Sequence, residues 1–239
     1  MSRSIRVVFL DAANTLFHVE GSVAELYLQH AVKFGFARTP ASLGAIERAF
    51  SRAFQEAPPP VFAAIQPAQI KQSERLWWFD IVHNVFYRVG MFERFDDFFE
   101  RVFEVFEDPN SWRLFPETVS TLTQLKAQGV ELGIISNFDS RLFTVMRGLG
   151  IESFFDSMTI SSLARAAKPA PKIFQLALDK HAVGPEEAIH IGDSLQDDLR
   201  GATKAGLHAV LLDRPGKHQT AGVQTIRTLD ELLPLLDRL

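Results

Sequence analysis

Hydrophobic and polar positions divide this chain into stretches of different character. Residues 5–10 form a short apolar run, partly β-branched and bounded by polar residues, which is typical of a buried strand. From about residue 17 to residue 110, apolar side chains recur at helical spacing, which predicts a group of amphipathic helices. The prolines at 58–60 and at 67 are expected to interrupt these helices, because proline cannot continue a helix.

From Pro116 onward the pattern alternates between helix and strand. We expect strands over residues 130–135, 155–160, 188–191 and 207–212. We expect helices over residues 116–127, 140–149, 171–181 and 197–205, with a short closing helix over 229–239 that Pro234 interrupts. Strands that alternate with helices predict right-handed crossovers and a parallel sheet.

The opening strand at residues 5–10 needs a partner, since a lone strand cannot bury both of its faces. The simplest solution places it in the parallel sheet, so that the helical stretch leaves the loop after this strand as an insertion. We therefore predict an α/β protein, with a doubly wound, Rossmann-like parallel sheet and an inserted helical cap domain. The predicted boundaries are residues 1–16 and 112–239 for the sheet domain and 17–111 for the cap.

Polar residues follow three of the predicted strands at the point where each strand ends. These residues are Asp11, Ser136 and Asp193. Because ligands of open parallel sheets bind beyond the carboxyl ends of the strands, we expect all three side chains to face one crevice. Asp11 or Ser136 alone would be explained by an ordinary turn or helix cap. Their convergence favours a ligand site.

The most acidic part of this crevice is the stretch 192–198, Gly-Asp-Ser-Leu-Gln-Asp-Asp. Its last two acids open a predicted helix, where the helix dipole favours negative charge, so capping explains Asp197. Asp193 lies at a strand tip and has no such explanation. Clustered carboxylates repel one another unless a cation or a base lies between them, and carboxylate oxygens suit Mg²⁺. The stretch therefore predicts a magnesium site.

Composition and charge narrow the classes of function. The chain has 46% hydrophobic and 23% charged residues, which is ordinary for a globular protein with a buried core. The net charge of −4, without a basic block, indicates neither nucleic acid nor an anionic membrane as partner. The first residues match neither a signal peptide nor a membrane span. The absence of cysteine excludes disulfides and thiol chemistry and agrees with a cytoplasmic location.

Four stretches, in this order and spacing, resemble the motifs of the haloacid dehalogenase (HAD) superfamily. They are Asp11-Ala12-Ala13-Asn14-Thr15, then Ser136-Asn137, then Lys168-Pro169, then Gly192-Asp193 with Asp198. The resemblance covers residues 5–16 and 112–214, and the stretch 201–206 is similar to the G-A-x-x-A-G sequence common in that superfamily. An insertion directly after the first motif resembles the C1 type of cap.

The resemblance implies a two-step hydrolysis of a small phosphorylated substrate. Asp11 would attack phosphorus and form an aspartyl-phosphate that water then hydrolyses. Ser136, and with it the Asn137 amide, would bind phosphoryl oxygens. Lys168 would neutralise charge and keep Asp11 ionised. Thr15 would fix the loop at the substrate site.

The same resemblance implies Mg²⁺ as the cofactor. Its ligands would be Asp11, Asp193, Asp198 and the main-chain oxygen of Ala13. Ala13 is also where the chain departs from the family, because phosphatases carry an Asp there that protonates the leaving group and later activates water. A methyl group can do neither, and general acid–base help contributes roughly 10²–10⁴-fold. Low activity is therefore expected.

Three explanations of Ala13 stay open. The first is a phosphate-ester hydrolase in which the substrate or a cap residue supplies the proton, or whose leaving group is good enough without one. His18, close behind the first motif, could also face the crevice and replace the missing acid. The second is cleavage of a different bond, as in phosphonatases, which use a cap lysine (here Lys33 or Lys71), or in haloacid dehalogenases, which lack the Gly-Asp of residues 192–193. The third is a non-enzymatic relative that binds a phosphate ligand or a protein. The sequence alone does not show whether Ala13 is natural or engineered. The substrate and the oligomeric state do not follow from it either.

Phenylalanine is concentrated in the predicted cap, at positions 92, 95, 98, 99, 103 and 106. Helical spacing favours the interpretation that these rings form the core of a small helical domain. The alternative is an aromatic substrate pocket or a dimer face.

Overall fold

The computed structural model describes residues 5–64, 66–217 and 222–236. A parallel six-stranded sheet forms the centre, in the order β5-β4-β1-β6-β7-β8. Its strands are β1 (Val7–Leu10), β4 (Glu131–Ser136), β5 (Ser157–Ile160), β6 (Ala188–Gly192), β7 (His208–Leu212) and β8 (Thr225–Ile226). The opening strand pairs with β4 on one side and with β6 on the other, which confirms its predicted place in the sheet.

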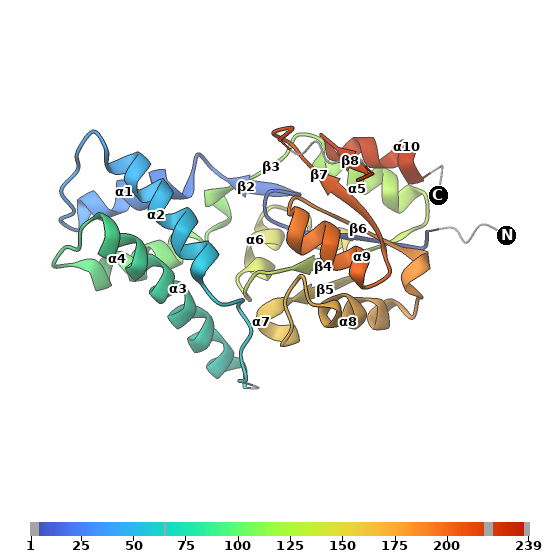
Figure 1. The fold of residues 1–239 in the computed structure, drawn as a ribbon, viewed down its shortest axis with the longest axis horizontal. Coiled ribbons are helices and arrows are strands. Elements are labelled where there is room, and N and C mark those ends of the chain that lie inside the picture. The colour runs from blue at the N-terminus through green and yellow to red at the C-terminus, as the bar shows by residue number, and fades with distance from the viewer. Residues whose placement is uncertain (1–4, 65, 218–221, 237–239) are drawn as a thin grey trace.

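Helices cover both faces of the sheet because the side chains of β1 alternate between two apolar clusters. Val8 and Leu10 belong to one cluster, and Val7 and Phe9 belong to the other. The helices of the sheet domain are α5 (Thr118–Ala127), α6 (Leu142–Gly148), α7 (Ser161–Ala164), α8 (Pro171–His181), α9 (Gly201–Lys204) and α10 (Leu233–Leu236). Figure 1 shows this layered arrangement, and the predicted doubly wound fold is confirmed.

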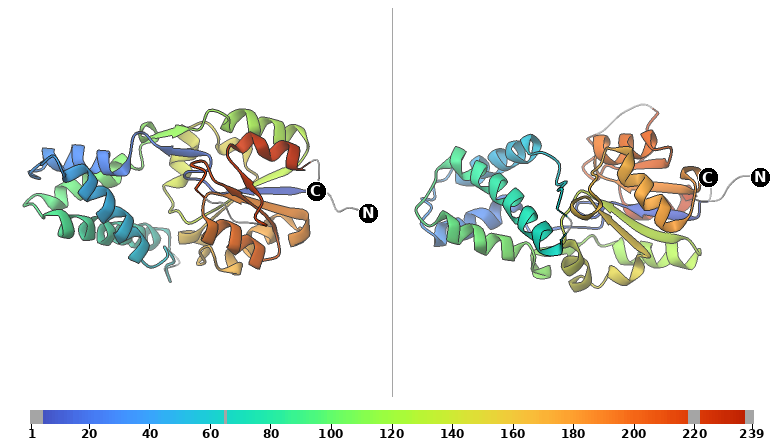
Figure 2. Two further views of the ribbon diagram at one scale, coloured as in Figure 1. Left: turned by 45° about the horizontal axis from the view of Figure 1, so that its top comes forward. Right: turned by 90° about the horizontal axis from the view of Figure 1, so that it is seen from below.

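A separate group of helices, the helical insert, lies beside the sheet (Figures 1 and 2). It contains α1 (Val23–Lys33), α2 (Ser42–Glu56), α3 (Pro67–Val89) and α4 (Phe95–Val105). The insert has its own apolar cluster, in which Phe95, Phe98 and Phe99 are buried. The interpretation of these rings as core side chains is confirmed. The prolines at 58–60 lie between α2 and α3, and Pro67 begins α3, where proline is tolerated.

Two short strands connect the insert to the sheet. Strand β2 (Phe17–Val19) pairs with β3 (Trp112–Leu114) in an antiparallel ribbon that the sequence did not predict. Strands of three residues are too short to show a period in the sequence. Because the chain leaves β1 directly into this ribbon, the carboxyl ends of the parallel strands face the insert (Figure 1).

Two predicted helices differ in detail. The helix expected at 197–205 begins earlier, as a π-helical segment Leu195–Arg200 that continues into α9. At the closing helix, a 3₁₀ turn at Leu229–Leu232 precedes α10, so the interruption comes before Pro234, and residues 237–239 lie outside the described residues. Within the described residues, every helix is too short or too polar to span a lipid bilayer.

Candidate active site at the carboxyl ends of the strands

The buried Lys168 contacts both the nucleophile candidate Asp11 and Asp198 of the acidic stretch. The Lys168 Nζ donates to Asp11 Oδ1 at 2.6 Å and to Asp198 Oδ1 at 2.5 Å. Asp11 is 7% exposed and Lys168 is 3% exposed. Asp11 follows β1, and its backbone N–H bonds Ile191 in β6, so the centre of the sheet fixes its position. The structure therefore brings Lys168 to Asp11 across 157 positions of sequence, and to Asp198 across 30.

Asp198 is held from several directions. Its Oδ1 accepts from Lys168 and from His190 Nε2, and its Oδ2 accepts from the Ser194 N–H at 2.9 Å. Gly192 leaves room for this carboxylate, since a Cβ there would lie 2.1 Å from Asp198 Cγ. Burial opposes ionisation of Asp198, but the Lys168 charge and the His190 hydrogen bond outweigh it and lower the pKa well below its usual range. Asp198 thus serves here as a fixed negative partner for Lys168.

Lys168 remains a cation in this environment. Burial by itself would lower its pKa, but the charges of Asp11 and Asp198 raise the pKa above its ordinary value. Asn137 fixes the backbone of Lys168, because its side chain accepts from the Lys168 N–H at 2.8 Å and donates to the Lys168 carbonyl at 2.9 Å. The Asn137 amide, expected at the substrate, thus orients the lysine in this structure.

Asp193 completes an acidic cluster. Carboxylate oxygens of Asp11, Asp193 and Asp198 all lie within 4.8 Å of one another. Burial, followed by the charges of Asp11 and Asp198, raises the pKa of Asp193 to about 7. Burial also raises the pKa of Asp11 despite the opposing effect of Lys168. A divalent cation would relieve this excess of negative charge, so the residues fit Mg²⁺. Asp11 and Asp193 accept fewer hydrogen bonds from protein donors than Asp198 does, which makes them the better candidates for ligands.

The acidic cluster predicts that protons and Mg²⁺ compete at Asp193. Because the pKa of Asp193 is raised to about 7 in the folded protein, its carboxyl group stabilises the fold while it is protonated. This contribution is complete below the unfolded-state pKa and is lost as the pH rises through about 7. We therefore expect the metal-free protein to lose stability between about pH 4 and about pH 7, and Mg²⁺ to restore it most strongly at about pH 8. At about 100 Kd of Mg²⁺ the gain is about 2.7 kcal/mol, or roughly 5–10 °C in Tm.

Thermal unfolding in chelator and in Mg²⁺, from about pH 5 to about pH 8, measures this effect. Asp193→Asn should remove both the pH dependence and the Mg²⁺ response, whereas Asp80→Asn, an exposed position on α3, should keep both. An unchanged Mg²⁺ response in Asp193→Asn would contradict the assigned ligand.

The other predicted residues lie at the same edge of the sheet. Ser136 is the last residue of β4 and is buried. Thr15 is fully buried, and its carbonyl accepts from Arg214 Nη2 at 2.8 Å. Arg214 also donates to the Asn14 carbonyl at 3.2 Å. Arg214 was not predicted from the sequence, although its position just after β7 matches the strand-end rule that identified the others.

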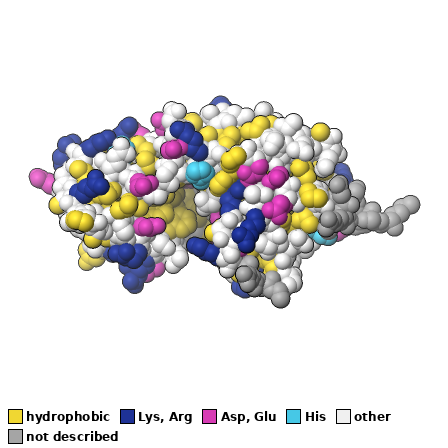
Figure 3. Space-filling model, turned by 90° about the horizontal axis from the view of Figure 1, so that it is seen from above, with side chains coloured by type: hydrophobic (Ala, Val, Ile, Leu, Met, Phe, Trp, Pro, Cys, Tyr) yellow, Lys and Arg dark blue, Asp and Glu magenta, His cyan; other side chains and the backbone are white. Residues whose placement is uncertain are grey.

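An open pocket of about 690 Å³ adjoins the acidic cluster. Its lining includes Asn14, His18, Asp193, Asp213 and Arg214. Asn14 adopts a left-handed backbone (φ 62°), which asparagine tolerates better than most residues, and this conformation turns the chain from β1 toward β2. Figure 3 shows that the surface is hollowed where the helical insert meets the sheet domain, with charged side chains of both signs nearby.

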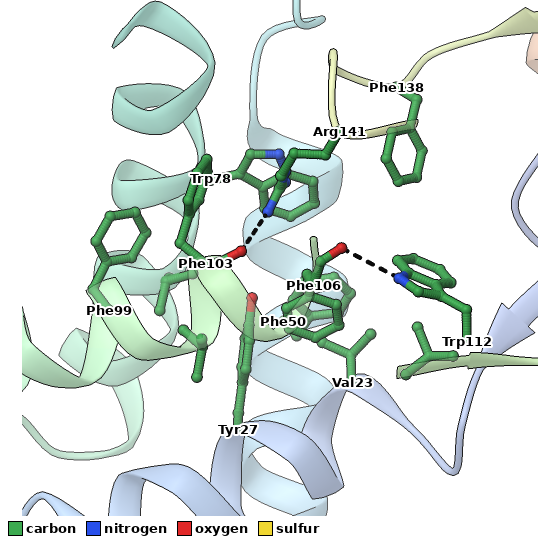
Figure 4. A pocket seen from close by; sticks show the side chains of 13 residues that line it. Val23, Tyr27, Phe50, Trp78, Phe99, Phe103, Phe106, Trp112, Phe138 and Arg141 are labelled. Carbon is green, nitrogen blue, oxygen red and sulfur yellow. Dashed lines mark hydrogen bonds between the residues drawn. The ribbon is translucent and has the colours of Figure 1, made fainter. Parts of the chain in front are cut away.

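The helical insert is fastened to the loop that follows Ser136. The buried Glu74 of α3 accepts from the Ser140 N–H and from the Ser140 hydroxyl. Trp78 Nε1 donates to Asp139 Oδ2, and Arg141 pairs with Asp139 while donating to the Phe103 carbonyl at 3.1 Å (Figure 4). The position of the insert is thereby linked to the strand end that carries Ser136. The sequence contained no signal for these contacts.

A small aromatic cavity lies beside this connection. It measures about 70 Å³, and Figure 4 shows Tyr27, Trp78, Phe103, Trp112 and other rings around it. Among the described residues, the Tyr27 hydroxyl has no hydrogen-bond partner, and burial raises its pKa, so the phenol stays neutral. Most of the aromatic side chains of the insert pack into its core, and this cavity is the part of that core that borders the sheet domain.

Comparison with known proteins agrees with this architecture. The family model described as haloacid dehalogenase-like hydrolase matches residues 5–206. Haloacid dehalogenase-like hydrolase domain-containing protein 3 of Danio rerio is 30% identical over 236 residues, 95% of each chain. Glyceraldehyde 3-phosphate phosphatase of Methanopyrus kandleri is 40% identical over 106 residues, 44% of this chain and 45% of that protein.

Solved structures show the same fold. The 2-haloacid dehalogenase of Pseudomonas syringae superposes with a TM-score of 0.65 at 25% identity, over 98% of this chain and 99% of the other. The match to the family model covers most of the chain, and the relative from Danio rerio extends over nearly its full length. The chain belongs to the haloacid dehalogenase-like hydrolase family.

Proposed function

We propose that this chain hydrolyses a small phosphorylated compound, with Asp11 as nucleophile and Mg²⁺ as cofactor. The observation that carries the proposal is the buried ammonium of Lys168 between Asp11 and Asp198, with Asp193 beside them. This arrangement offers one negative nucleophile and an excess of oxygen ligands at the edge of an open pocket. The similarity of part of the chain to an archaeal glyceraldehyde 3-phosphate phosphatase supports a phosphate ester as substrate.

In this mechanism the side chains divide the work of the first displacement. The Asp11 carboxylate attacks phosphorus, and the Ser136 hydroxyl donates to a phosphoryl oxygen. Lys168 stabilises the negative charge of the transferring group and stays protonated throughout. Asn137 and Asp198 keep Lys168 in place, and Arg214 holds the loop after Asp11 through the Thr15 carbonyl.

The metal site would be formed by Asp11, Asp193, the main-chain oxygen of Ala13 and, more distantly, Asp198. Mg²⁺ bound there would neutralise part of the phosphoryl charge and orient the substrate. We further propose that the helical insert acts as a C1-type cap. The hydrogen bonds that Glu74 accepts from Ser140 and that Trp78 donates to Asp139 would relate its position to the substrate site.

The competing carbon–phosphorus and carbon–halogen reactions have less support. A Schiff-base lysine needs a pKa lowered by burial or by another cation. Lys33 and Lys71, the lysines of the insert, are both exposed. A metal-free dehalogenase would have no use for this acidic cluster, in which burial, followed by the charges of Asp11 and Asp198, raises the pKa of Asp193 to about 7. Ala13 itself is the observation that keeps the dehalogenase as second candidate.

Phosphate release from glyceraldehyde 3-phosphate, sugar phosphates and p-nitrophenyl phosphate, with and without Mg²⁺, tests the proposal. The native chain is expected to turn over at least one of them only with Mg²⁺, and Ala13→Asp to be at least as active on alkyl esters. Activity that appears only in Ala13→Asp would identify a non-enzymatic relative. Halide release from 2-chloropropionate without metal would identify a dehalogenase.

A further inference from the structure

Cleavage of an alkyl phosphate requires a proton for the departing oxygen, because an alkoxide is a poor leaving group. This inference rests on the proposed function and concerns the source of that proton. The methyl group of Ala13 cannot supply it, and the buried Lys168 is held as a cation by Asp11 and Asp198. The donor must therefore be sought elsewhere along the pocket.

The geometry of phosphoryl transfer indicates where the donor has to be. The attacking and leaving oxygens lie roughly in line on opposite sides of phosphorus. A leaving group displaced by Asp11 consequently points away from the sheet, toward open space. The pocket of about 690 Å³ next to Asp193 provides this space, and His18 is one of its lining residues.

His18 is arranged so that one ring nitrogen is fixed and the other is available. Its Nδ1 lies 2.9 Å from the Val19 carbonyl, and because a carbonyl only accepts, Nδ1 carries a proton and donates it. The ring packs against Phe115, with a centroid distance of 4.9 Å. Among the described residues, Nε2 has no hydrogen-bond partner. With Nδ1 fixed as donor, Nε2 is the ring atom left to give or take a proton.

The other charged groups near this ring have different tasks. Arg113 pairs opposite His18 in the β2–β3 ribbon and forms an ion pair with Glu20. Arg214 donates to the Asn14 and Thr15 carbonyls and pairs with Glu117. Asp213 accepts from the Lys217 N–H, and Asp193 belongs to the acidic cluster. His18 also lines the pocket, does not belong to the metal site, and offers a ring nitrogen that none of these contacts uses.

We propose that His18 is the general acid and base of the reaction in place of a carboxylic acid at position 13. As the bond between Asp11 and phosphorus forms and the ester P–O bond breaks, His18 Nε2–H gives its proton to the departing oxygen, which leaves as an alcohol. Neutral His18 then takes a proton from the water that attacks the aspartyl-phosphate. Inorganic phosphate leaves, Asp11 is again a carboxylate and His18 is again protonated.

His18→Gln tests the proposal, because glutamine keeps a polar side chain but cannot act as an acid or a base. With Mg²⁺, kcat on an alkyl ester such as glyceraldehyde 3-phosphate should fall by about 10²-fold or more. On p-nitrophenyl phosphate, whose leaving group departs without a proton, the fall should stay below about 10-fold. His208→Gln, at the start of β7 and exposed, should match the native chain on both substrates. Adding Ala13→Asp to His18→Gln should restore activity on the alkyl ester.

The outcomes separate this inference from the function on which it rests. Equal losses on both substrates, or none on either, with an active native chain, would overturn the role of His18 and leave the hydrolase standing. A native chain that turns over neither substrate would overturn the hydrolase, and the role of His18 with it. Failure of Ala13→Asp to restore the alkyl reaction would show that His18→Gln acts through structure.

Discussion

Asp11→Asn is expected to abolish Mg²⁺-dependent phosphate release while leaving the protein folded. The amide cannot form the covalent intermediate, so kcat should fall by on the order of 10⁴-fold or more. Stability should change little, because Lys168 keeps Asp198 as its second partner and one of the three crowded carboxylates is removed. We expect the free energy of unfolding to change by less than about 1 kcal/mol, or roughly 4 °C in Tm.

The measurements are kcat on the best substrate of the native chain and thermal unfolding of both proteins. Asp80→Asn serves as the matched control, since it makes the same chemical change at an exposed position of α3. An Asp11→Asn variant that still released phosphate at the native rate would exclude Asp11 as nucleophile. An inactive variant that was also unfolded would show only that Asp11 is needed for the fold.

Lys168→Met is expected to cost both activity and stability. Lys168 is the cation between two buried carboxylates, and removal of one partner from a buried ion pair costs about 3–5 kcal/mol, because it leaves the other charge unpaired. For a chain of this size the loss corresponds to roughly 6–20 °C in Tm. Activity should be lost as well, since the positive charge that stabilises the transferring group is gone.

Two further variants locate the origin of this loss. Asp198→Asn in the Lys168→Met background should recover part of the lost stability, because it removes one of the stranded charges. Mg²⁺ should raise the Tm of Lys168→Met more than that of the native chain, since the cation replaces the missing ammonium. Lys172→Met, exposed on α8, is the control and should resemble the native chain. A Lys168→Met variant as stable as this control would contradict the assigned ion pairs.

Local patterns in the sequence were sufficient for the framework of this protein. The short apolar run at residues 5–10 identified β1 as a sheet strand, and the alternation of helix and strand after Pro116 predicted a parallel sheet. The strand-end rule then selected Asp11, Ser136 and Asp193, which the structure places along one edge. These inferences succeeded because burial imposes a period on each element that can be read within ten or twenty residues.

Tertiary structure alone decided how these residues act on one another. Lys168 meets Asp11 only because distant segments pack around the same edge, and Asn137 orients that lysine from a third segment. The β2–β3 ribbon and the contacts of Glu74 with the loop after Ser136 also had no local signal. Such contacts depend on the angle and distance at which whole elements pack, and the spacing of residues along the chain does not record these quantities.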